Sequence, residues 1–361
     1  LVDGTLWTDD EMIRLGASSK TARAMGHLPQ SGAGGMLEWL AELPWASWQQ
    51  AAPPPWLAVL ASLGCVWALL PRGTPARWVG LAMLLPLLLW APPRPAPGEA
   101  RVTVLDVGQG LAVHVQTAGH DLLYDTGPAF SADANSGERI LLPYLRAEGV
   151  RRLDSLVVTH QDNDHSGGAE AVLTGIPVAE VRSSLSQNHP ARLIAGARHQ
   201  PCVAGQTWDW DGVRFTMLHP GRAADDSPGS KTNDVACVLR VEAGGLSALL
   251  TSDIEAVSEA ELLQGQAGQL ASDVLVVPHH GSRSSSTAAF IAATRPRWVI
   301  FPVGYLNRFR HPNAQVWARW AATGAGMWRT DASGAVSVHL APGGPRFETA
   351  RAAAPRYWHG R

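Results

Sequence analysis

The chain is poor in lysine and cysteine, and its charges nearly cancel. Among its 361 residues lysine occurs only at Lys20 and Lys231, so arginine supplies nearly all of the positive charge. A formal net charge of −2 gives no global basic field, so charge argues neither for nor against a nucleic-acid partner. Three cysteines exclude a disulfide framework: Cys65 lies in an apolar segment, so at most Cys202 and Cys237 can pair. Cysteine usage therefore indicates no compartment.

The chain also lacks an initial methionine, a signal-peptide pattern and an apolar run long enough to span a bilayer. It begins at Leu1, which indicates a fragment of a longer protein. Two uncharged apolar runs, 56–70 and 78–91, are shorter than the about 20 residues of a spanning helix, so a buried helical hairpin stays open as an interpretation. Their lack of charge and the tryptophans at their ends favour a membrane hairpin. Arg72 and Arg77 between them favour a cytoplasmic loop, with both flanks on the outer side.

One loop, by contrast, is dense in residues that bind metals. His160, Asp162, Asp164 and His165 lie within six residues, directly after an apolar run, 153–158, that predicts a buried strand. A strand that ends in such a loop presents its side chains from one rigid edge, as a metal site requires. Imidazole suits zinc, and carboxylates suit harder ions such as manganese. The alternative is a polar, Asx-rich loop that contains two histidines by chance.

Other metal-binding residue types follow four more predicted strands. A single Asp or His at a strand end is more often a helix cap or a hydrogen-bonded surface group. Several of them, each after an apolar strand and accompanied by the loop at 160–165, favour one shared site. These residues are Asp125, His219, Asp253 and the pair His279 and His280.

The order of the predicted elements indicates an α/β domain. Strand hairpins at 101–125 come first, and strands and helices then alternate as far as 340, which fits two packed sheets with helices outside. The proline-rich stretch before them predicts a semi-rigid linker, and the Ala-, Pro- and Arg-rich end of the chain predicts a frayed tail. The predicted parts are 1–45, a hairpin at 53–91, a linker at 92–100, a domain at 101–341 and a tail at 342–361.

The arrangement of these motifs resembles known families. The pattern His-x-Asp-x-Asp-His at 160–165, with Asp-Thr-Gly at 125–127 and His-His-Gly-Ser at 279–282, resembles the metallo-β-lactamase superfamily. The stretch of about residues 46–341 resembles the C-terminal part of the ComEC family of competence proteins, which are DNA-uptake channels of the inner membrane. The matching motifs lie at 105–110, 159–168, 278–282 and 308–312. Residues 1–44 resemble a piece of the pyrroloquinoline quinone biosynthesis protein B family, and we expect no activity from that piece alone.

The resemblance implies a four-layer αββα fold, preceded by a short membrane-helix hairpin, and two divalent metal ions, zinc or manganese. It assigns His160 and Asp162 to one ion and Asp164 and His165 to the other, with Asp253 bridging the two. His280 would complete the second set because it directly precedes Gly-Ser, although His279 stays an alternative. His219 either completes the first set or is a plain strand-end residue. Asp125 and Asp106 would orient the ligands.

Catalysis and phosphate binding are assigned by the same resemblance. Two ions about 4 Å apart share a hydroxide and stabilise the attacking and leaving oxygens of a phosphodiester. The catalytic candidates are Asp164, His279 and His311, and the candidates for holding phosphate are Arg283, Arg308 and Arg310. The alternatives are a loop position fixed by proline for His311 and a solvated surface for each arginine. Ser252 replaces a glycine that is usual in the family, and we expect it to alter substrate contacts more than metal binding.

Three functions follow as hypotheses. The first is a metal-dependent phosphodiesterase or nuclease on the extracytoplasmic side of the inner membrane, held there through residues 56–91. It would hydrolyse single-stranded or duplex DNA during uptake, with other competence-pilus or channel components as partners. The second is a small-molecule hydrolase of the same fold. The third is a catalytically inactive domain that serves only as part of a transport channel.

Overall fold

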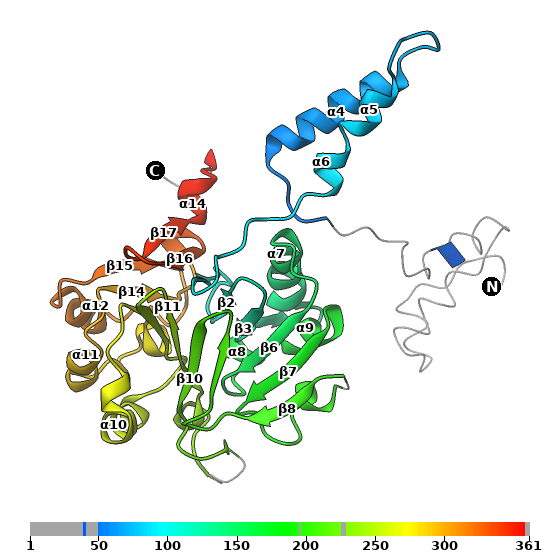
Figure 1. Ribbon diagram of the computed structural model, residues 1–361. Coiled ribbons are helices and arrows are strands. Elements are labelled where there is room, and N and C mark those ends of the chain that lie inside the picture. The colour runs from blue at the N-terminus through cyan, green and yellow to red at the C-terminus, as the bar shows by residue number, and fades with distance from the viewer. Residues whose placement is uncertain (1–38, 41–49, 195, 225–228, 358–361) are drawn as a thin grey trace. The chain divides into compact units, whose positions relative to one another are not determined.

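The computed structural model describes residues 39–40, 50–194, 196–224 and 229–357 (Figure 1). The predicted segment 1–45 lies outside the described residues except for Trp39 and Leu40. The chain divides into two compact units, Leu1–Gln50 and Ala51–Arg361. The second unit contains helix α4 and every later element.

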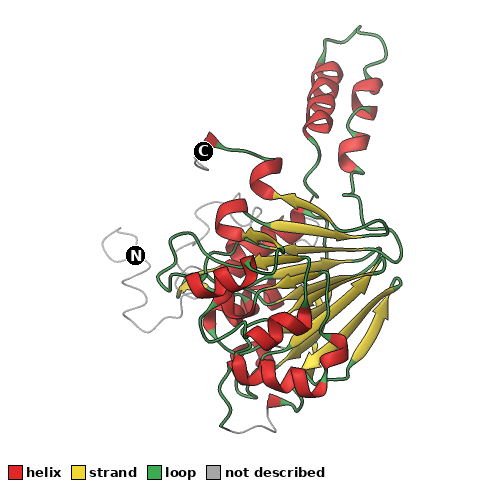
Figure 2. Cartoon of the chain, turned by 90° about the vertical axis from the view of Figure 1, so that its left-hand side faces the viewer, coloured by secondary structure: helices red, strands yellow, loops and turns green. Residues whose placement is uncertain are grey.

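A helical hairpin opens the second unit. Helix α4 (Pro55–Leu69) lies alongside α5 (Trp78–Ala82) and α6 (Leu85–Leu88) in both Figures 1 and 2. Glycine lets the helices touch, since a Cβ on Gly64 would lie only 2.6 Å from the carbonyl oxygen of Gly80. Many of its large apolar side chains are exposed, Leu69 by 81% and Leu89 by 78%. Among the described residues no helix has both the length and the apolar character to cross a membrane. The helical hairpin is therefore present, and its predicted membrane span is not shown.

Two sheets, formed by residues that follow the linker in the sequence, pack face to face. The strand order in the first sheet is β17 (Arg346–Thr349), β16 (Val336–Leu340), β1 (Ala100–Val104), β2 (Val113–Gln116), β3 (Asp121–Tyr124), β6 (Leu153–Val158), β7 (Val178–Ser183), β8 (Arg198–Pro201). The order in the second is β15 (Gly326–Arg329), β14 (Trp298–Phe301), β13 (Val274–Val276), β12 (Leu246–Leu250), β11 (Val238–Ala243), β10 (Val213–His219), β9 (Thr207–Trp210). A small ribbon joins β4 (Ala129–Ser131) to β5 (Ala134–Asn135). The run β3, β6, β7, β8 and the run β12 to β15 are parallel.

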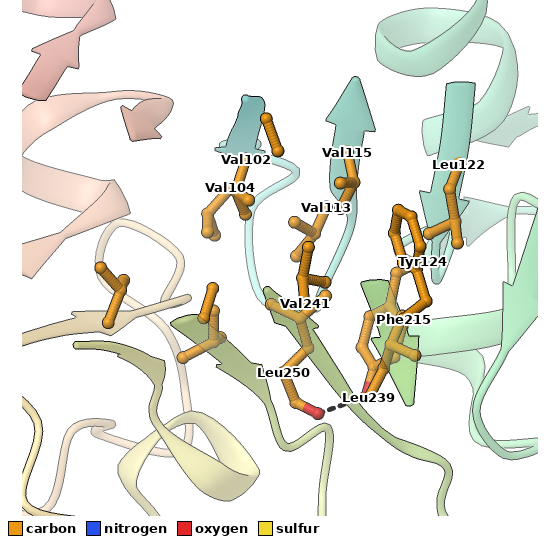
Figure 3. Close-up of a cluster of buried hydrophobic side chains, with 14 of the residues drawn as sticks. Val102, Val104, Val113, Val115, Leu122, Tyr124, Phe215, Leu239, Val241 and Leu250 are labelled. Atoms are coloured by element: carbon orange, nitrogen blue, oxygen red, sulfur yellow. Dashed lines mark hydrogen bonds between the residues drawn. The ribbon is translucent and has the colours of Figure 1, made fainter. Parts of the chain in front are cut away.

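The core between the sheets comes from alternate residues of the strands, because successive side chains on a strand point to opposite faces. Val102 and Val113 from the first sheet meet Phe215 and Leu250 from the second (Figure 3). The hydroxyl of buried Tyr124 donates a hydrogen bond of 3.1 Å to the Leu250 carbonyl oxygen of the opposite sheet.

Helices cover both outer faces, so the domain has the four αββα layers that were predicted. The first sheet carries a π-helical turn (Gly137–Leu141), α7 (Leu142–Ala147), α8 (Asn163–Ser166) and α9 (Ala169–Gly175). The second carries α10 (Ala256–Gly265), α11 (Ala288–Thr294) and α12 (Ala314–Ala321). Figure 1 shows α7 and α9 on one side of the sheets and α10 to α12 on the other. Short helices α13 (Thr330–Ser333) and α14 (Ala350–Ala353) flank the last two strands.

The prediction of a frayed tail from 342 on is wrong for residues that form β17. Arg346–Thr349 pairs antiparallel with β16, and Phe347 packs against Trp298 with ring centroids 4.7 Å apart. Strand pairing and aromatic burial stabilise this segment, and both depend on residues distant in the sequence. Strands β7, β8, β9 and β15 were likewise not expected; β8 has the sequence Arg-His-Gln-Pro, which lacks any apolar alternation.

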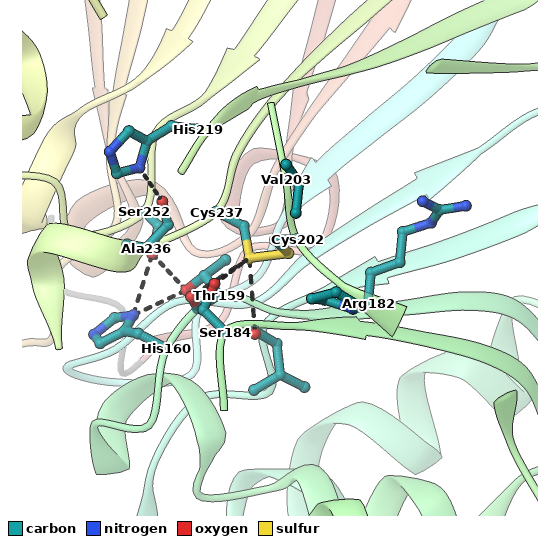
Figure 4. Close-up of a disulfide and its surroundings, with 12 residues drawn as sticks. Thr159, His160, Arg182, Ser184, Cys202, Val203, His219, Ala236, Cys237 and Ser252 are labelled. Atoms are coloured by element: carbon teal, nitrogen blue, oxygen red, sulfur yellow. Dashed lines mark hydrogen bonds between the residues drawn. A yellow bond between two sulfur atoms is a disulfide. The ribbon is translucent and has the colours of Figure 1, made fainter. Parts of the chain in front are cut away.

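A disulfide ties the two sheets together. It joins Cys202, just after β8, to Cys237, just before β11, with Cα atoms 5.9 Å apart (Figure 4). Both cysteines are fully buried. This is the one pairing that the sequence left open, and Cys65 is a free, exposed cysteine.

Candidate metal centre

The predicted ligands meet where strands from both sheets end. Asp125 follows β3, and the loop with His160 follows the parallel neighbour β6. Asp253 follows β12, and His280 follows the parallel neighbour β13. The carboxyl ends of parallel strands lie at one edge, which is where α/β sheets bind ligands.

Four of these side chains, Asp164, His165, Asp253 and His280, form a compact group that we call the Asp–His cluster. One ligand atom from each lies within 4.8 Å of the others. The Nε2 atom of His165 is 3.1 Å from Asp253 Oδ1 and 3.3 Å from His280 Nε2. The Nε2 atom of His280 is 3.3 Å from Asp164 Oδ2. His165 and His280 come from different sheets, so the cluster exists only when the sheets are packed.

The two histidines of the cluster each anchor Nδ1 on the protein and direct Nε2 inward. His165 Nδ1 lies 2.7 Å from the Asp125 carboxylate, and His280 Nδ1 donates to the Pro302 carbonyl oxygen at 2.8 Å. In neutral rings with these Nδ1 protons, two Nε2 lone pairs would face each other at 3.3 Å. That arrangement is unfavourable unless a proton or a metal ion lies between them. Buried Asp253 Oδ1 lies 3.1 Å from His165 Nε2 and 3.5 Å from His280 Nε2, and it has no assigned hydrogen bond among the described residues. These donors therefore fit a divalent ion.

His160 and His219 show the same anchoring beside the cluster. His160 Nδ1 lies 2.9 Å from Thr159 Oγ1, and His219 Nδ1 donates to the Ala236 carbonyl oxygen at 2.7 Å (Figure 4). Both Nε2 atoms are buried, and neither has a hydrogen bond within the described part of the chain. The His160 ring lies 4.2 Å from the His165 ring, measured between centroids. His160 is therefore in contact with the cluster, whereas His219 Nε2 lies 3.4 Å from Glu261 Oε2.

Asp162 is more exposed than the residues of the Asp–His cluster. Its side chain is 43% exposed, and its Oδ2 is 3.7 Å from His160 Nε2. Within the described part of the chain, the residues whose ligand atoms all lie within 4.8 Å of one another are those of the Asp–His cluster. His160, Asp162 and His219 do not belong to that group.

Asp125 and Thr159 hold the rings of His160 and His165 in place through hydrogen bonds. The Asp125 carboxylate accepts hydrogen bonds from the Thr159 backbone and hydroxyl, both at 2.8 Å, and contacts His165. Asp125 was predicted to orient ligands; Thr159 was not predicted, although its place between the strand and His160 marks it. The Ser252 hydroxyl lies 2.6 Å from Thr159 Oγ1 and 3.5 Å from His160 Nδ1, and Ser252 is only 2% exposed. Ser252 therefore contacts the residues that orient His160, and its predicted effect on substrate contacts stays a prediction.

The backbone at these strand ends is left-handed. Asp125, Ser252, His279 and His280 have φ of 60°, 49°, 48° and 54°, a region that side chains other than glycine rarely adopt. Four such residues around one group of ligands indicate strain held in place by the surrounding packing, as is common at functional sites.

The glycine motif at 108–110 packs directly against the metal-ligand loop. The Leu111 backbone donates to the Asp164 carbonyl oxygen at 3.0 Å, and a Cβ on Gly110 would lie 2.4 Å from that oxygen. Only glycine permits this approach, so the motif supports Asp164 from the backbone side. Asp106, predicted to orient ligands, instead accepts from the Gly108 backbone and lies 3.7 Å from Arg351. None of its contacts among the described residues reaches the Asp–His cluster.

The two adjacent histidines have different surroundings. His280 is 2% exposed and directs Nε2 into the cluster. The His279 side chain is 23% exposed, with Nδ1 3.2 Å from Glu255 Oε1 and Nε2 3.6 Å from Asp253 Oδ2. His280 therefore has the geometry of a ligand, and His279 that of a group at the rim. Glu255 was not predicted, because its role appears only when His279 is brought to it.

The remaining candidates, His311 and three arginines, lie in the loops near His279 and His280. The His311 ring lies 6.4 Å from the His280 ring and 6.1 Å from the His279 ring, between centroids. Its Nδ1 is buried, and no described residue forms a hydrogen bond with it. Three exposed arginines, Arg283, Arg308 and Arg310, lie in the same two loops as these histidines.

Burial and neighbouring charges act on the cluster in opposite directions. Burial would raise the pKa of Asp253, but His165 and His280 outweigh it and hold that pKa well below 3.8. Burial would lower the pKa of His165, yet Asp253 and Asp125 raise it well above 6.5. Burial and the charge of His165 lower the pKa of His160 to about 4. Without an ion, protons on His165 therefore balance the aspartates, and a bound cation would replace them.

The sequence of the chain is similar to that of a known family and of several known proteins. The sequence pattern of the family described as "Metallo-beta-lactamase superfamily" matches residues 105–304. The chain is 39% identical over 315 residues to Competence protein ComA of Neisseria gonorrhoeae, covering 87% of this chain and 43% of that protein. It is 34% identical over 241 residues to Recombination protein 2 of Haemophilus influenzae, covering 66% of this chain and 29% of that protein.

A short stretch has a different relative. Over 44 residues, 12% of this chain, it is 91% identical to Coenzyme PQQ synthesis protein B of Azoarcus sp. and covers 14% of that protein. The resemblances predicted from the motifs are thus confirmed. The chain spans less than half the length of each of these relatives.

Proposed function

Because the chain belongs to the metallo-β-lactamase superfamily, we propose that the Asp–His cluster binds divalent metal ions and that the domain hydrolyses phosphodiester bonds in DNA. The observation that supports this most is the pair of inward Nε2 atoms of His165 and His280, 3.3 Å apart beside Asp253 Oδ1. Such a group is stable only with protons or a cation at its centre.

Two sets of ligands are proposed. Asp164, His165 and His280 would hold one ion, and His160, Asp162 and His219 the other, with Asp253 between them. Imidazole nitrogens suit zinc, and the carboxylates, Asp162 among them, also suit manganese. When bound, two such ions supply a water of lowered pKa and positive charge for the attacking and leaving oxygens.

The chain's own residues would position the substrate around this centre. Asp125 and Thr159 keep the His165 ring fixed, so its lone pair stays aligned. His279, held by Glu255, lies at the rim where a leaving oxygen could take its proton. His311 faces the same rim. Three exposed arginines would bind the phosphates on either side of the scissile bond: Arg283, Arg308 and Arg310.

DNA is proposed as the substrate because two similar proteins are named as a competence protein and a recombination protein. We propose attachment to the inner membrane through residues 56–91, supported by exposed apolar side chains such as Leu69 and Leu89. The catalytic domain would face the extracytoplasmic side, supported by the buried disulfide between Cys202 and Cys237, since disulfides persist in oxidising compartments. Its partners would be other competence-pilus or channel components.

The test uses the purified chain, residues 1–361, with labelled single-stranded and duplex DNA and added zinc or manganese. We expect metal-dependent cleavage, and we expect Asp164→Asn to lose both bound metal and cleavage. Asp133→Asn, at an exposed aspartate, is the matched control and should cleave like the original chain. Bound metal without DNA cleavage would redirect the proposal to small phosphodiesters. If the protein neither binds metal nor cleaves DNA, the proposal is refuted.

A further inference from the structure

A column of stacked planar groups leads from the Asp–His cluster to the protein surface. The His280 and His311 rings are 24° from parallel, and the His311 and Phe309 rings lie 5.8 Å apart and only 14° from parallel. The Arg308 guanidinium then lies over Phe309, 4.8 Å from the ring centroid. His280 is 2% exposed and Phe309 is 53% exposed, so the column connects a buried ligand to solvent.

The loop that presents this column is held rigidly. The Asn307 side chain donates to the carbonyl oxygens of Gly304 and His311, at 3.1 and 2.8 Å, and accepts from the His311 backbone at 2.8 Å. At the base of the loop, a Cβ on buried Gly304 would lie 2.5 Å from the Gln109 backbone nitrogen. The exposure of its apolar side chains is therefore built into the fold and does not result from a loose loop.

Between the two ends of this loop, apolar and basic side chains alternate at the surface. Tyr305 is 75% exposed and Leu306 is 83% exposed, and Phe309 lies between exposed Arg308 and Arg310. Aromatic rings interleaved with arginine are what proteins use to bind single-stranded nucleic acid, because every base has a π-face and every nucleotide a phosphate. In a duplex those faces are covered by neighbouring bases.

We propose that Phe309 and Tyr305 form a stacking platform for unpaired bases. A base would displace the Arg308 guanidinium from the face of Phe309 opposite His311, and Arg308 and Arg310 would then hold the adjoining phosphates. The platform makes single-stranded nucleic acid the preferred substrate class, since a base on Phe309 places its strand beside the Asp–His cluster. This inference rests on the proposed phosphodiesterase function and names the form of substrate that the site accepts.

The test compares two labelled single strands with equal numbers of phosphates, one with bases and one abasic. We expect Phe309→Ala to weaken binding and cleavage of the strand with bases by roughly 5- to 150-fold, with little change for the abasic strand. Phe309→Trp should restore the preference. Leu306→Ala, in the same loop but without a ring to stack, is the matched control and should behave like the original chain. Equal losses on both strands, or none, would overturn the platform.

Metal content and binding without cleavage separate this inference from the proposed function. Phe309→Ala should retain the metal content of the original chain, because Phe309 contacts His311 and no cluster residue. A loss of metal would show that the column only supports His280 and would overturn the platform. Cleavage that is insensitive to Phe309 would leave the phosphodiesterase standing and refute the platform. If no protein cleaves, base-dependent binding that is lost in Phe309→Ala would support the platform while the phosphodiesterase fails.

Discussion

Two groups in this domain each pair buried histidine with aspartate, and they differ in their bonding. In the first, His114 uses both ring nitrogens within the protein: Nε2 lies 3.0 Å from Asp121 Oδ1, and Nδ1 lies 3.2 Å from the Tyr144 hydroxyl. Asp121 is also bonded by Gln116 and by Arg94 of the linker, at 3.2 and 3.1 Å. Every polar atom of this group has a partner, and the group fixes the linker to the sheet.

The Asp–His cluster differs in where the second ring nitrogen points. His165 and His280 each satisfy Nδ1 and leave Nε2 directed at each other and at Asp253. A satisfied group stabilises the fold by itself, whereas a group of converging lone pairs needs a cation. The difference between a structural and a ligand-binding group is therefore the direction of one nitrogen, not the residue types. The following predictions test that difference.

The largest effect is expected from Asp253→Asn. The amide removes the charge that faces both His165 and His280, so we expect metal content to fall at least about 100-fold and cleavage to be lost. Metal analysis of the purified protein measures this. Urea unfolding of the metal-free variant is the control, and it should show that the variant is still folded in the absence of urea. A variant with full metal content would contradict the assignment.

Asp121→Asn is the matched change in the satisfied group. It leaves His114 and Arg94 without their carboxylate, so we expect the free energy of unfolding to fall by about 3 kcal/mol. Urea denaturation measures the loss. Metal content should stay unchanged, and a parallel loss of metal would show that the two groups are not independent.

Asp125→Asn should act on the metal without removing a ligand. It takes away the carboxylate that aligns His165 and should lower metal affinity about 10- to 100-fold. Competition with a chelator gives the affinity. An effect as large as that of Asp253→Asn would instead indicate that Asp125 binds the ion directly.

pH should separate the two groups as well. The pKa of His165 is raised above 6.5, so its charged pair stabilises the metal-free protein at low pH, and that contribution is lost as pH rises through the folded-state pKa. An ion needs the ring unprotonated, so affinity should rise by up to about tenfold per pH unit below that pKa. Burial would raise the pKa of Asp121, but His114 and Arg94 lower it. The contribution of Asp121 to the free energy of unfolding is therefore lost only in acid, below pH 3.8. Chelator titrations at pH 6 and 8 would test this, and a pH-independent affinity would contradict it.

The smallest effect is expected from Ser252→Gly. Glycine relieves a φ of 49° but loses the contact with Thr159 Oγ1, and these terms oppose each other. We expect a net change within about 1 kcal/mol in unfolding free energy and less than about tenfold in metal affinity. A complete loss of metal would show that the Ser252 hydroxyl is essential for orienting His160.

The predicted elements that the structure reproduces are those with strong local patterns. The apolar run of β6 and the ligands that follow it are contiguous, so their adjacency could be predicted. β17 could not, because Arg346–Thr349 is extended only through pairing with β16 and the packing of Phe347 on Trp298. Thr159 and Glu255 were missed for a related reason: their roles appear only when Asp125 and His279 are brought to them.

The sequence by itself determined which residues stand at the ends of buried strands, because a strand and the residues that follow it are neighbours along the chain. Tertiary structure decided which of them converge. His165 and His280 belong to different sheets, and only the packing of the two sheets directs their Nε2 atoms at one point. It also gave His279 and His280 different surroundings, because both residues are left-handed and the Pro302 carbonyl oxygen anchors His280, whereas His279 lies 3.2 Å from Glu255. Side-chain direction depends on contacts between distant segments, and residue spacing does not contain that information.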